Sequence, residues 1–147
     1  SKYRVLNNRE LRARVEVLWD QYNMILGIEA RTMVSMLKTQ VMPAALRHQT
    51  ELAEAVAATQ AAGVDCENTR AELQELVDMI DELRGANQAV QQAETHQLTG
   101  SQRHARHIRD SLIPAMDCAR AASDALESVI PADLWTLPTY GEMLFLR

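Results

Sequence analysis

One long stretch, residues 8–62, constrains the fold of this chain more than any other feature. Its apolar residues recur in alternating steps of four and three, at Leu11, Val15, Leu18, Tyr22 and Ile25, and then at Leu26, Ala30, Met33, Leu37, Val41, Ala44 and Ala45. This spacing is that of an α-helix. At about 1.5 Å per residue, a continuous helix here would be roughly 80 Å long. A rod of that length has no compact core of its own, so we expect other helices to pack along it.

Two further helical segments are predicted, at 66–97 and 102–129. Gly63 ends the first helix, and Ser101 is the expected N-cap of the third. The apolar stripe of the second helix turns polar between Asn87 and Glu94, so we expect the helix to leave the core or to fray there. The alanine-rich stripe of the third helix should lie against the long first helix. No alternating β-branched run exceeds three residues. The sequence therefore predicts an all-α fold, an elongated antiparallel bundle of three long helices.

Two prolines, Pro43 and Pro114, fall inside the first and third predicted helices. A proline in a helix interior removes one hydrogen bond and clashes with the carbonyl four residues earlier, here that of Thr39 or Asp110. Because the apolar pattern continues beyond each proline, we expect kinks rather than helix ends. The contexts are similar, Val-Met-Pro-Ala and Leu-Ile-Pro-Ala, so two rods bent alike can remain in contact through the bend.

The tail, residues 131–147, differs in composition from the three helices. It contains Trp135, Pro138, Tyr140 and Phe145 in a short stretch without helical periodicity. Exposing that much aromatic area to water is unfavourable. We therefore expect an irregular tail that folds back onto the bundle or docks on a neighbouring surface.

Charge and cysteine usage argue against several classes of function. The net charge is −5, from 20 acidic and 15 basic residues interspersed along the helices, which gives no basic field for nucleic acid. The two cysteines, Cys66 and Cys118, match no zinc-site or disulfide pattern and are expected as free thiols in a reducing compartment. No run approaches 18 apolar residues and no signal peptide is evident. We expect a cytoplasmic protein that contacts neither nucleic acid nor membrane.

Few residues suggest chemistry, and for each a structural role is favoured. Glu29 lies in an otherwise apolar stretch and lacks a partner acid, base or metal ligand, so we expect it to pair with an arginine of another helix or domain. His104 and His107 are one helical turn apart, but a third ligand is not evident, and a solvated helix N-terminus is the favoured interpretation. No catalytic, cofactor-binding or metal-binding residue is predicted. Four methionines are interpreted as core filling, Met24, Met33, Met36 and Met42.

Two stretches carry a family resemblance. The first is the helix with Tyr22, Ile28-Glu29-Ala30, Thr32-Met33, Met36 and Met42-Pro43-Ala44, and the second is the tail Asp133-Leu-Trp-Thr-Leu-Pro-Thr-Tyr-Gly-Glu-Met-Leu-Phe145. Together with Pro114-Ala-Met116, Arg120 and Asp124-x-Leu-Glu127, they resemble the C-terminal region of the type III glutamine synthetases. The tail departs from the family at Thr136, where proline is usual, and at Gly141, where a basic residue is common.

The resemblance implies that the parent protein is an ATP- and magnesium-dependent ligase that joins ammonia to glutamate and assembles as double hexameric rings. In that family the catalytic residues lie in a preceding domain, so none is assigned to this chain. The implied role is to brace the catalytic domain or to contact neighbouring subunits of a homo-oligomer, through candidate interface residues Glu29, Pro43, Pro114, Trp135, Pro138, Tyr140 and Phe145. The sequence is compatible with an alternative role and argues against another. One is a stand-alone helical interaction module; the other, a ferritin-type metal enzyme, lacks the paired Glu-x-x-His motifs it needs.

Overall fold

The structure, a computed structural model, describes residues 7–96, 98–138 and 143–144. Within these ranges it contains helices and no β-strand, so the all-α prediction is confirmed there. In chain order the elements are α1 (Asn8–Met36), the π-helical turn η1 (Leu37–Val41), α2 (Met42–Ala61), α3 (Glu67–Thr95), α4 (Ser101–His107), the π-helical turn η2 (Ile108–Leu112) and α5 (Ile113–Val129).

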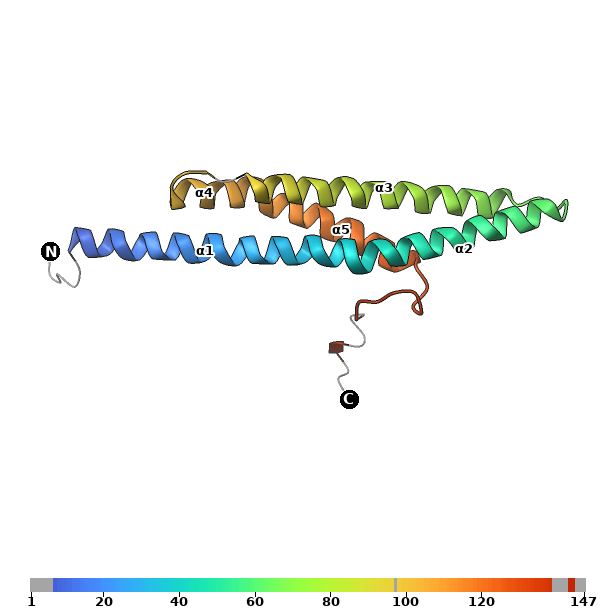
Figure 1. Cartoon of the computed structure of the whole chain (residues 1–147), viewed down its shortest axis with the longest axis horizontal. Helices are drawn as coiled ribbons and strands as arrows, with labels where there is room; N and C mark the ends of the chain where they lie inside the picture. The colour runs from blue at the N-terminus through green and yellow to red at the C-terminus, as the bar shows by residue number, and fades with distance from the viewer. Residues whose placement is uncertain (1–6, 97, 139–142, 145–147) are drawn as a thin grey trace.

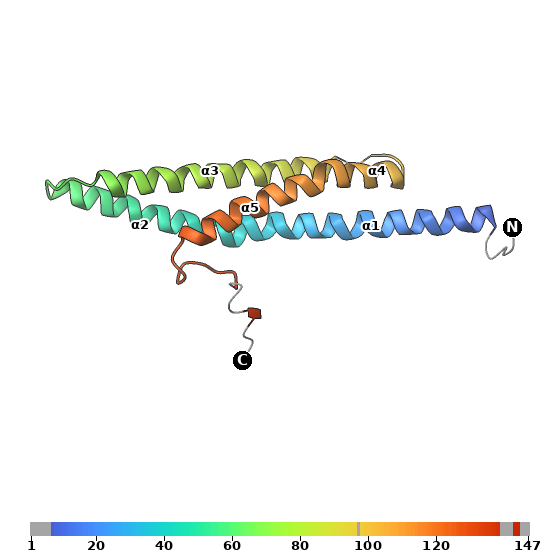
Figure 2. The same cartoon turned by 180° about the vertical axis from the view of Figure 1, so that it is seen from behind.

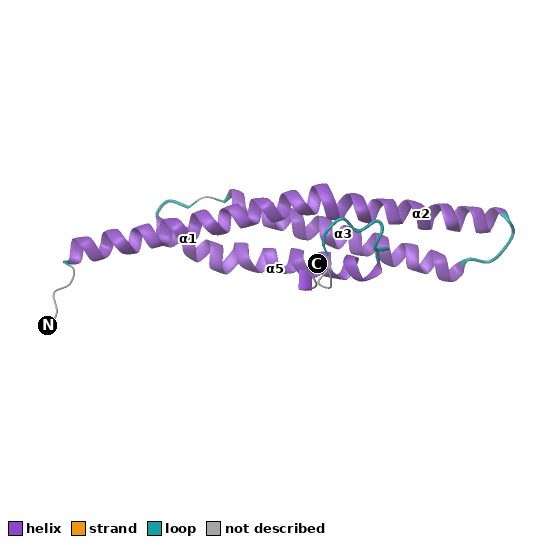
Figure 3. Ribbon diagram, turned by 90° about the horizontal axis from the view of Figure 1, so that it is seen from below, coloured by secondary structure: helices purple, strands orange, loops and turns teal. Residues whose placement is uncertain are grey.

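Each π-helical turn joins its neighbours without a break, so the elements form three rods, at 8–61, 67–95 and 101–129. The first rod runs along the whole molecule, the second returns beside it, and the third runs back between them (Figure 1). The N-terminal turns of α1 extend past α4 and lie beside no other helix in the views from the front, from behind and from below (Figures 1, 2 and 3). Every residue from 8 to 18 is exposed. We call this segment, residues 8–18, the α1 overhang.

Local signals explain where the rods begin and turn. The Asn7 side chain accepts a hydrogen bond from the Glu10 amide, and the Glu10 carboxylate accepts one from the Asn7 amide, each at 2.8 Å. This capping box satisfies two amides that the first turn leaves without helical partners. Gly63 and Gly100 have φ values of 73° and 96°, which favour glycine over residues with a Cβ. Gly100, rather than the predicted Ser101, is therefore the N-cap of α4.

A π-helical turn precedes each of the two prolines that were predicted to kink a helix. The amide of Met42 donates to the Leu37 carbonyl, five residues earlier, and the amide of Ile113 donates to that of Ile108. Pro43 and Pro114 then occupy the second positions of α2 and α5, the part of a helix in which proline is best tolerated. Widening the helix for one turn thus accommodates the proline while the rod continues.

The core runs along the three rods, and α3 lies at its centre. α5 packs chiefly against α3, whereas α4 packs against α1, so the predicted contact of the third helix with the first is found for α4 and not for α5. A continuous cluster of buried residues fills the space between the rods: Ala30, Leu37, Val41, Ala44 and Ala45 from the first rod, Leu76, Ile80, Leu83 and Val90 from α3, and Ile108, Leu112, Ala119, Ala122 and Leu126 from the third.

The polar end of α3 does not leave the core as expected. Asn87 and Val90 are both buried, and the helix continues to Thr95. Its polar side chains instead reach across to α1: Arg31 donates to Glu94 at 2.6 Å. The apolar stripe of α3 becomes polar here because the edges of this part of the helix contact α1. Ion pairs and hydrogen bonds make that contact in place of apolar side chains. Among the described residues, no helix is both long and apolar enough to cross a bilayer.

Candidate interaction site

The tail turns back onto the bundle directly after α5. The amides of Leu134 and Trp135 donate to the Pro131 carbonyl at 3.0 and 3.1 Å, which forms a tight turn. Trp135 is 9% exposed and belongs to the core cluster, with Leu134 and Leu137 packed against it. Its indole Nε1 is buried and has no hydrogen-bond partner among the residues that the structure describes. Two other candidate interface residues, Tyr140 and Phe145, lie outside the described residues.

Beside Trp135, a groove of about 750 Å³ lies between α1, α5 and the tail. Its apolar walls come from three segments: Leu26, Ile28, Met33 and Met36 with Leu37 and Val41 of the first rod, Ile113 and Met116 of the third rod, and Leu137, Pro138 and Met143 of the tail. Three of these side chains, Ile28, Met36 and Met143, are exposed although they are apolar. An exposed apolar surface of this kind marks an interaction site more often than a solvated face.

Acidic side chains border the same groove. They are Glu29 of α1 and Asp117, Asp124 and Glu127 of α5. Within the described part of the chain, none of these four carboxylates makes a hydrogen bond or an ion pair. Arg120 also lies in the lining, and it has an interaction of its own. We call the whole the acid-rimmed groove.

The structure brings three of the predicted interface residues together and separates two from them. Glu29, Trp135 and Pro138 line the acid-rimmed groove, while Pro43, half-buried, and Pro114, exposed, lie outside its lining. Glu29 is exposed rather than partly buried, and no arginine among the described residues pairs with it. Its position on the rim explains the difference: the apolar neighbours in its sequence are wall residues of the groove.

The methionines were predicted as core filling, and this is wrong for two of them. Met24 and Met36 are 59% and 38% exposed, whereas Met33 and Met42 pack against the core. Met36 and Met33 form part of the groove wall, together with Met116. Methionine side chains are flexible and polarizable, so a wall that contains several of them adapts to irregular partners. Helical period alone does not separate a core methionine from a groove methionine.

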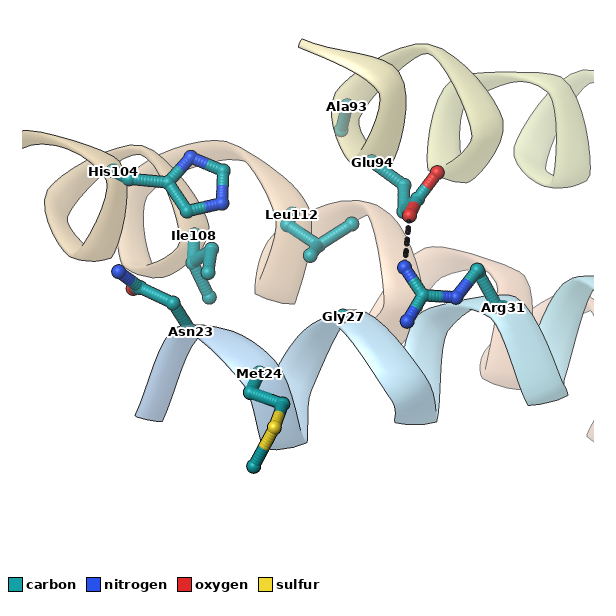
Figure 4. A pocket seen from close by; sticks show the side chains of 9 residues that line it. All are labelled: Asn23, Met24, Gly27, Arg31, Ala93, Glu94, His104, Ile108 and Leu112. Atoms are coloured by element: carbon teal, nitrogen blue, oxygen red, sulfur yellow. Dashed lines mark hydrogen bonds and ion pairs between the residues drawn. The ribbon is translucent and has the colours of Figure 1, made fainter. Parts of the chain in front are cut away.

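A smaller hollow, of about 230 Å³, lies where α1, α3 and the third rod meet (Figure 4). On one side, Arg31 and Glu94 close it with their ion pair. On the other side, the Asn23 amide nitrogen donates to the Ser101 carbonyl at 2.9 Å. His104 points into the hollow, and its buried Nδ1 lacks a hydrogen-bond partner. These contacts join rods, so we interpret the hollow as a structural junction.

The histidine pair is packed rather than solvated as expected. His104 and His107 are half-buried, and His107 Nε2 donates to the Ala93 carbonyl at 2.9 Å. The ring of His96, beyond the end of α3, lies 5.1 Å from that of His107, centroid to centroid. Sequence reasoning missed this contact because His96 belongs to another rod. In the part of the chain that the structure describes, no three histidine, cysteine or acidic side chains are grouped so that they could hold a metal ion.

One ion pair shifts pKa values on the surface of η2. Arg109 donates to both carboxylate oxygens of Asp110, at 2.6 and 2.9 Å. These hydrogen bonds hold the pKa of Asp110 below its ordinary value and raise that of Arg109. The pair lies apart from both the groove and the hollow, and it has no evident role beyond local electrostatics.

Comparison with known proteins adds to this geometry. Residues 1–60 match the model of a family described as the glutamine synthetase C-terminal domain. The whole chain is 31% identical to a type-3 glutamine synthetase of Dictyostelium discoideum, over 155 aligned residues that make up 21% of that protein. It is also 25% identical, over 98% of its length, to a glutamine synthetase of Bacteroides fragilis, again covering 21% of the relative.

The share of each protein that these matches cover is as informative as the sequence identity. The chain spans about a fifth of the length of the curated relatives, and nearly all of the chain is aligned. A glutamine synthetase of Butyrivibrio fibrisolvens gives the same picture, with 23% identity over 99% of this chain. These matches confirm the resemblance drawn from the helix and tail motifs: the chain matches a C-terminal domain of type III glutamine synthetases.

Proposed function

We propose that this chain is a non-catalytic helical domain of an enzyme that makes glutamine from glutamate, ammonia and ATP. Its role is to brace the catalytic domain of the same polypeptide or to contact neighbouring subunits of a homo-oligomer. The whole chain aligns with about a fifth of each relative. This supports a helical domain that is separate from the catalytic part of the enzyme. ATP and magnesium are then bound by the rest of the full-length enzyme. The proposal places the protein in the cytoplasm, in keeping with two free thiols, Cys66 and Cys118.

The acid-rimmed groove is the observation that carries the bracing role. Its walls expose Ile28, Met36 and Met143 to solvent, and its rim holds four carboxylates without partners among the described residues. Apolar surface next to unpaired charge is the composition of a contact with another protein surface. The indole of Trp135 is buried in the core cluster and also lines the groove. It therefore positions the tail, which forms one wall of the groove.

Replacing Trp135 by alanine in the full-length enzyme tests this role. Removing a buried indole from a core typically costs about 3–5 kcal/mol, and here it also removes support for the tail wall. We expect a lower melting temperature and partial loss of the oligomer, measured by calorimetry and light scattering. Val64→Ala is the matched control, because Val64 is an exposed apolar residue in the α2–α3 turn, outside the groove. Unchanged melting and unchanged oligomer size in the Trp135 variant would contradict the proposal.

A second candidate is a stand-alone helical interaction module. The continuous core across all three rods favours it, because a chain with its own core is able to fold without a further domain. Sequencing the gene upstream of the first codon separates the two candidates. An open reading frame that continues for several hundred codons with synthetase motifs supports the first, and a start codon immediately before Ser1 or Lys2 supports the second.

A further inference from the structure

The apolar stripe of the α1 overhang lies beyond the end of the bundle core. Tyr22, Leu26, Ala30 and Met33 of α1 are buried or packed on the core. Leu11, Val15 and Leu18 continue the stripe of Tyr22 toward the N-terminus, where they are 51%, 41% and 63% exposed.

This stripe continues along the helix into the acid-rimmed groove. From Leu11 and Leu18, steps of seven residues lead to Ile25 and Thr32, and from Val15 they lead to Glu29 and Met36. Ile25 is exposed, and Glu29, Thr32 and Met36 all line the groove. At about 3.6 residues per turn, positions seven residues apart lie on one face of a helix. The overhang stripe and the groove are therefore two ends of the same face of α1.

The two ends of this face have opposite charge. Arg14 flanks the overhang stripe on one side, and Arg12 lies on the other side with Glu16 one turn beyond it. The overhang carries three arginines, Arg9, Arg12 and Arg14, against two acids, Glu10 and Glu16. Glu10 is turned back to hydrogen bond with the Asn7 amide. The groove end is bordered instead by four carboxylates, among them Glu29 and Asp117, that have no partner among the described residues, and by one arginine, Arg120, which has an interaction of its own. A basic apolar stripe and an acidic apolar groove are complementary in both charge and polarity.

One molecule cannot satisfy this complementarity by itself. The overhang and the α1 wall of the groove belong to one continuous helix, which cannot fold back on itself. In a second copy placed antiparallel, each overhang would meet the groove of the other copy, so both contacts form at once. The overhang of eleven residues is about 16 Å long, close to the roughly 22 Å from Leu26 to Val41 along the groove wall. Self-complementarity of this kind is the requirement for a two-fold dimer.

We propose that two copies of this chain form a two-fold dimer in which α1 pairs antiparallel, each overhang lying in the acid-rimmed groove of the other. Arg12 and Arg14 of one copy face the carboxylate rim of the second, and Leu11, Val15 and Leu18 cover the methionine wall. The inference deepens the proposed function, on which it rests for the idea that this chain contacts further subunits. It identifies the face, the partner and the relative orientation.

Paired charge reversals in this 147-residue chain test the dimer. Sedimentation velocity over a wide concentration range should give a species of twice the 16.5 kDa chain mass. The basic-flank variant R12E/R14E and the acidic-rim variant E29R/D117R should each weaken dimerization by about tenfold or more, because like charges then face each other. Combining all four substitutions restores opposite charges and should recover the dimer. E82R, on the exposed surface of α3, is the control that should change nothing.

Each outcome separates this inference from its rivals. All the substituted residues are exposed, so circular dichroism should show unchanged helix content in every variant. A chain that remains monomeric at all concentrations overturns the inference, as does a dimer that ignores both charge reversals. A mass that rises through many multiples also overturns it, because it indicates an open, head-to-tail contact. If the 147-residue chain does not dimerize, the Trp135 experiment in the full-length enzyme still tests the proposed function. The two proposals are therefore tested independently.

Discussion

The two halves of α1 have the same helical period and a similar content of apolar residues. One half packs against the other rods, and the other half is exposed to solvent. Residues 26–36 pack against the other rods and include the buried Ala30 and the half-buried Leu26 and Met33. Residues 8–18 remain exposed, including Leu11 and Leu18, and among the described residues no helix packs along most of this segment (Figure 1). The comparison teaches that periodicity determines which residues share a face of a helix. The length of the neighbouring rods determines which part of that face is covered.

The largest expected difference between packed and unpacked regions is in the free energy of unfolding. Leu83 is fully buried at the centre of the core, so Leu83→Ala should cost about 2–5 kcal/mol. Leu18→Ala removes an exposed side chain and should change the stability of the monomer by less than about 0.5 kcal/mol. Urea unfolding at low protein concentration measures both. Equal losses in the two variants would mean that the overhang is packed in solution.

A smaller effect should distinguish local from global stability in the overhang. Asn7→Ala removes the side-chain half of the capping box, which is worth about 1 kcal/mol of helix stability. Because the overhang is exposed along its whole length, the loss should appear as faster hydrogen exchange of amides in residues 9–18, with little change in global unfolding. Exchange measured by mass spectrometry checks this. A matching loss of global stability would show that the overhang unfolds together with the core.

The ion pair between Arg31 and Glu94, at the edge of the packed half of α1, should contribute still less to the free energy of unfolding. Arg31 and Glu94 join α1 to α3 at 2.6 Å, but the arginine side chain is 61% exposed. Exposed pairs contribute about 0.2–1 kcal/mol, so a double-mutant cycle with Arg31→Ala and Glu94→Ala should give a coupling in that range that falls with added salt. A coupling that is zero at low salt would remove the pair from the forces that hold the two rods together.

The smallest expected effect is the pH dependence of the Arg109–Asp110 pair. The pKa of Asp110 is lowered in the folded state, chiefly by the hydrogen bond from Arg109. Its stabilising contribution is therefore present above the ordinary pKa of an aspartate and is lost as the pH falls through the lower, folded-state pKa. Asp110→Asn should flatten this part of the stability profile between about pH 5 and pH 2. Identical profiles for the variant and the original chain would contradict the assignment.

Much of the architecture could be predicted because helix signals are local. The rod boundaries in the structure, 8–61, 67–95 and 101–129, fall within two residues of the predicted ranges, since glycines and caps act on adjacent residues. What each proline does to its helix could not be predicted in detail. The wide turns before Pro43 and Pro114 depend on how the backbone relaxes between two packed segments.

The candidate site was only partly accessible to sequence reasoning. Glu29, Trp135 and Pro138 were singled out, and the structure places them around one groove. Asp117, Asp124 and Glu127, which complete the rim, were not, because acids spaced along an exposed helix look like an ordinary solvated face. The contact between His96 and His107 was missed for the same reason: its members come from different rods.

By itself, the sequence determined the all-α class, the length and limits of the rods, and the relationship to glutamine synthetases. These features depend on period, caps and motifs, each encoded within a few turns of chain. Only the tertiary structure decided which faces the rods bury, that α5 packs on α3, and that an overhang and an acid-rimmed groove lie at two ends of one helix face. Those features depend on which segments become neighbours, and side chains distant in sequence meet only after the rods have packed.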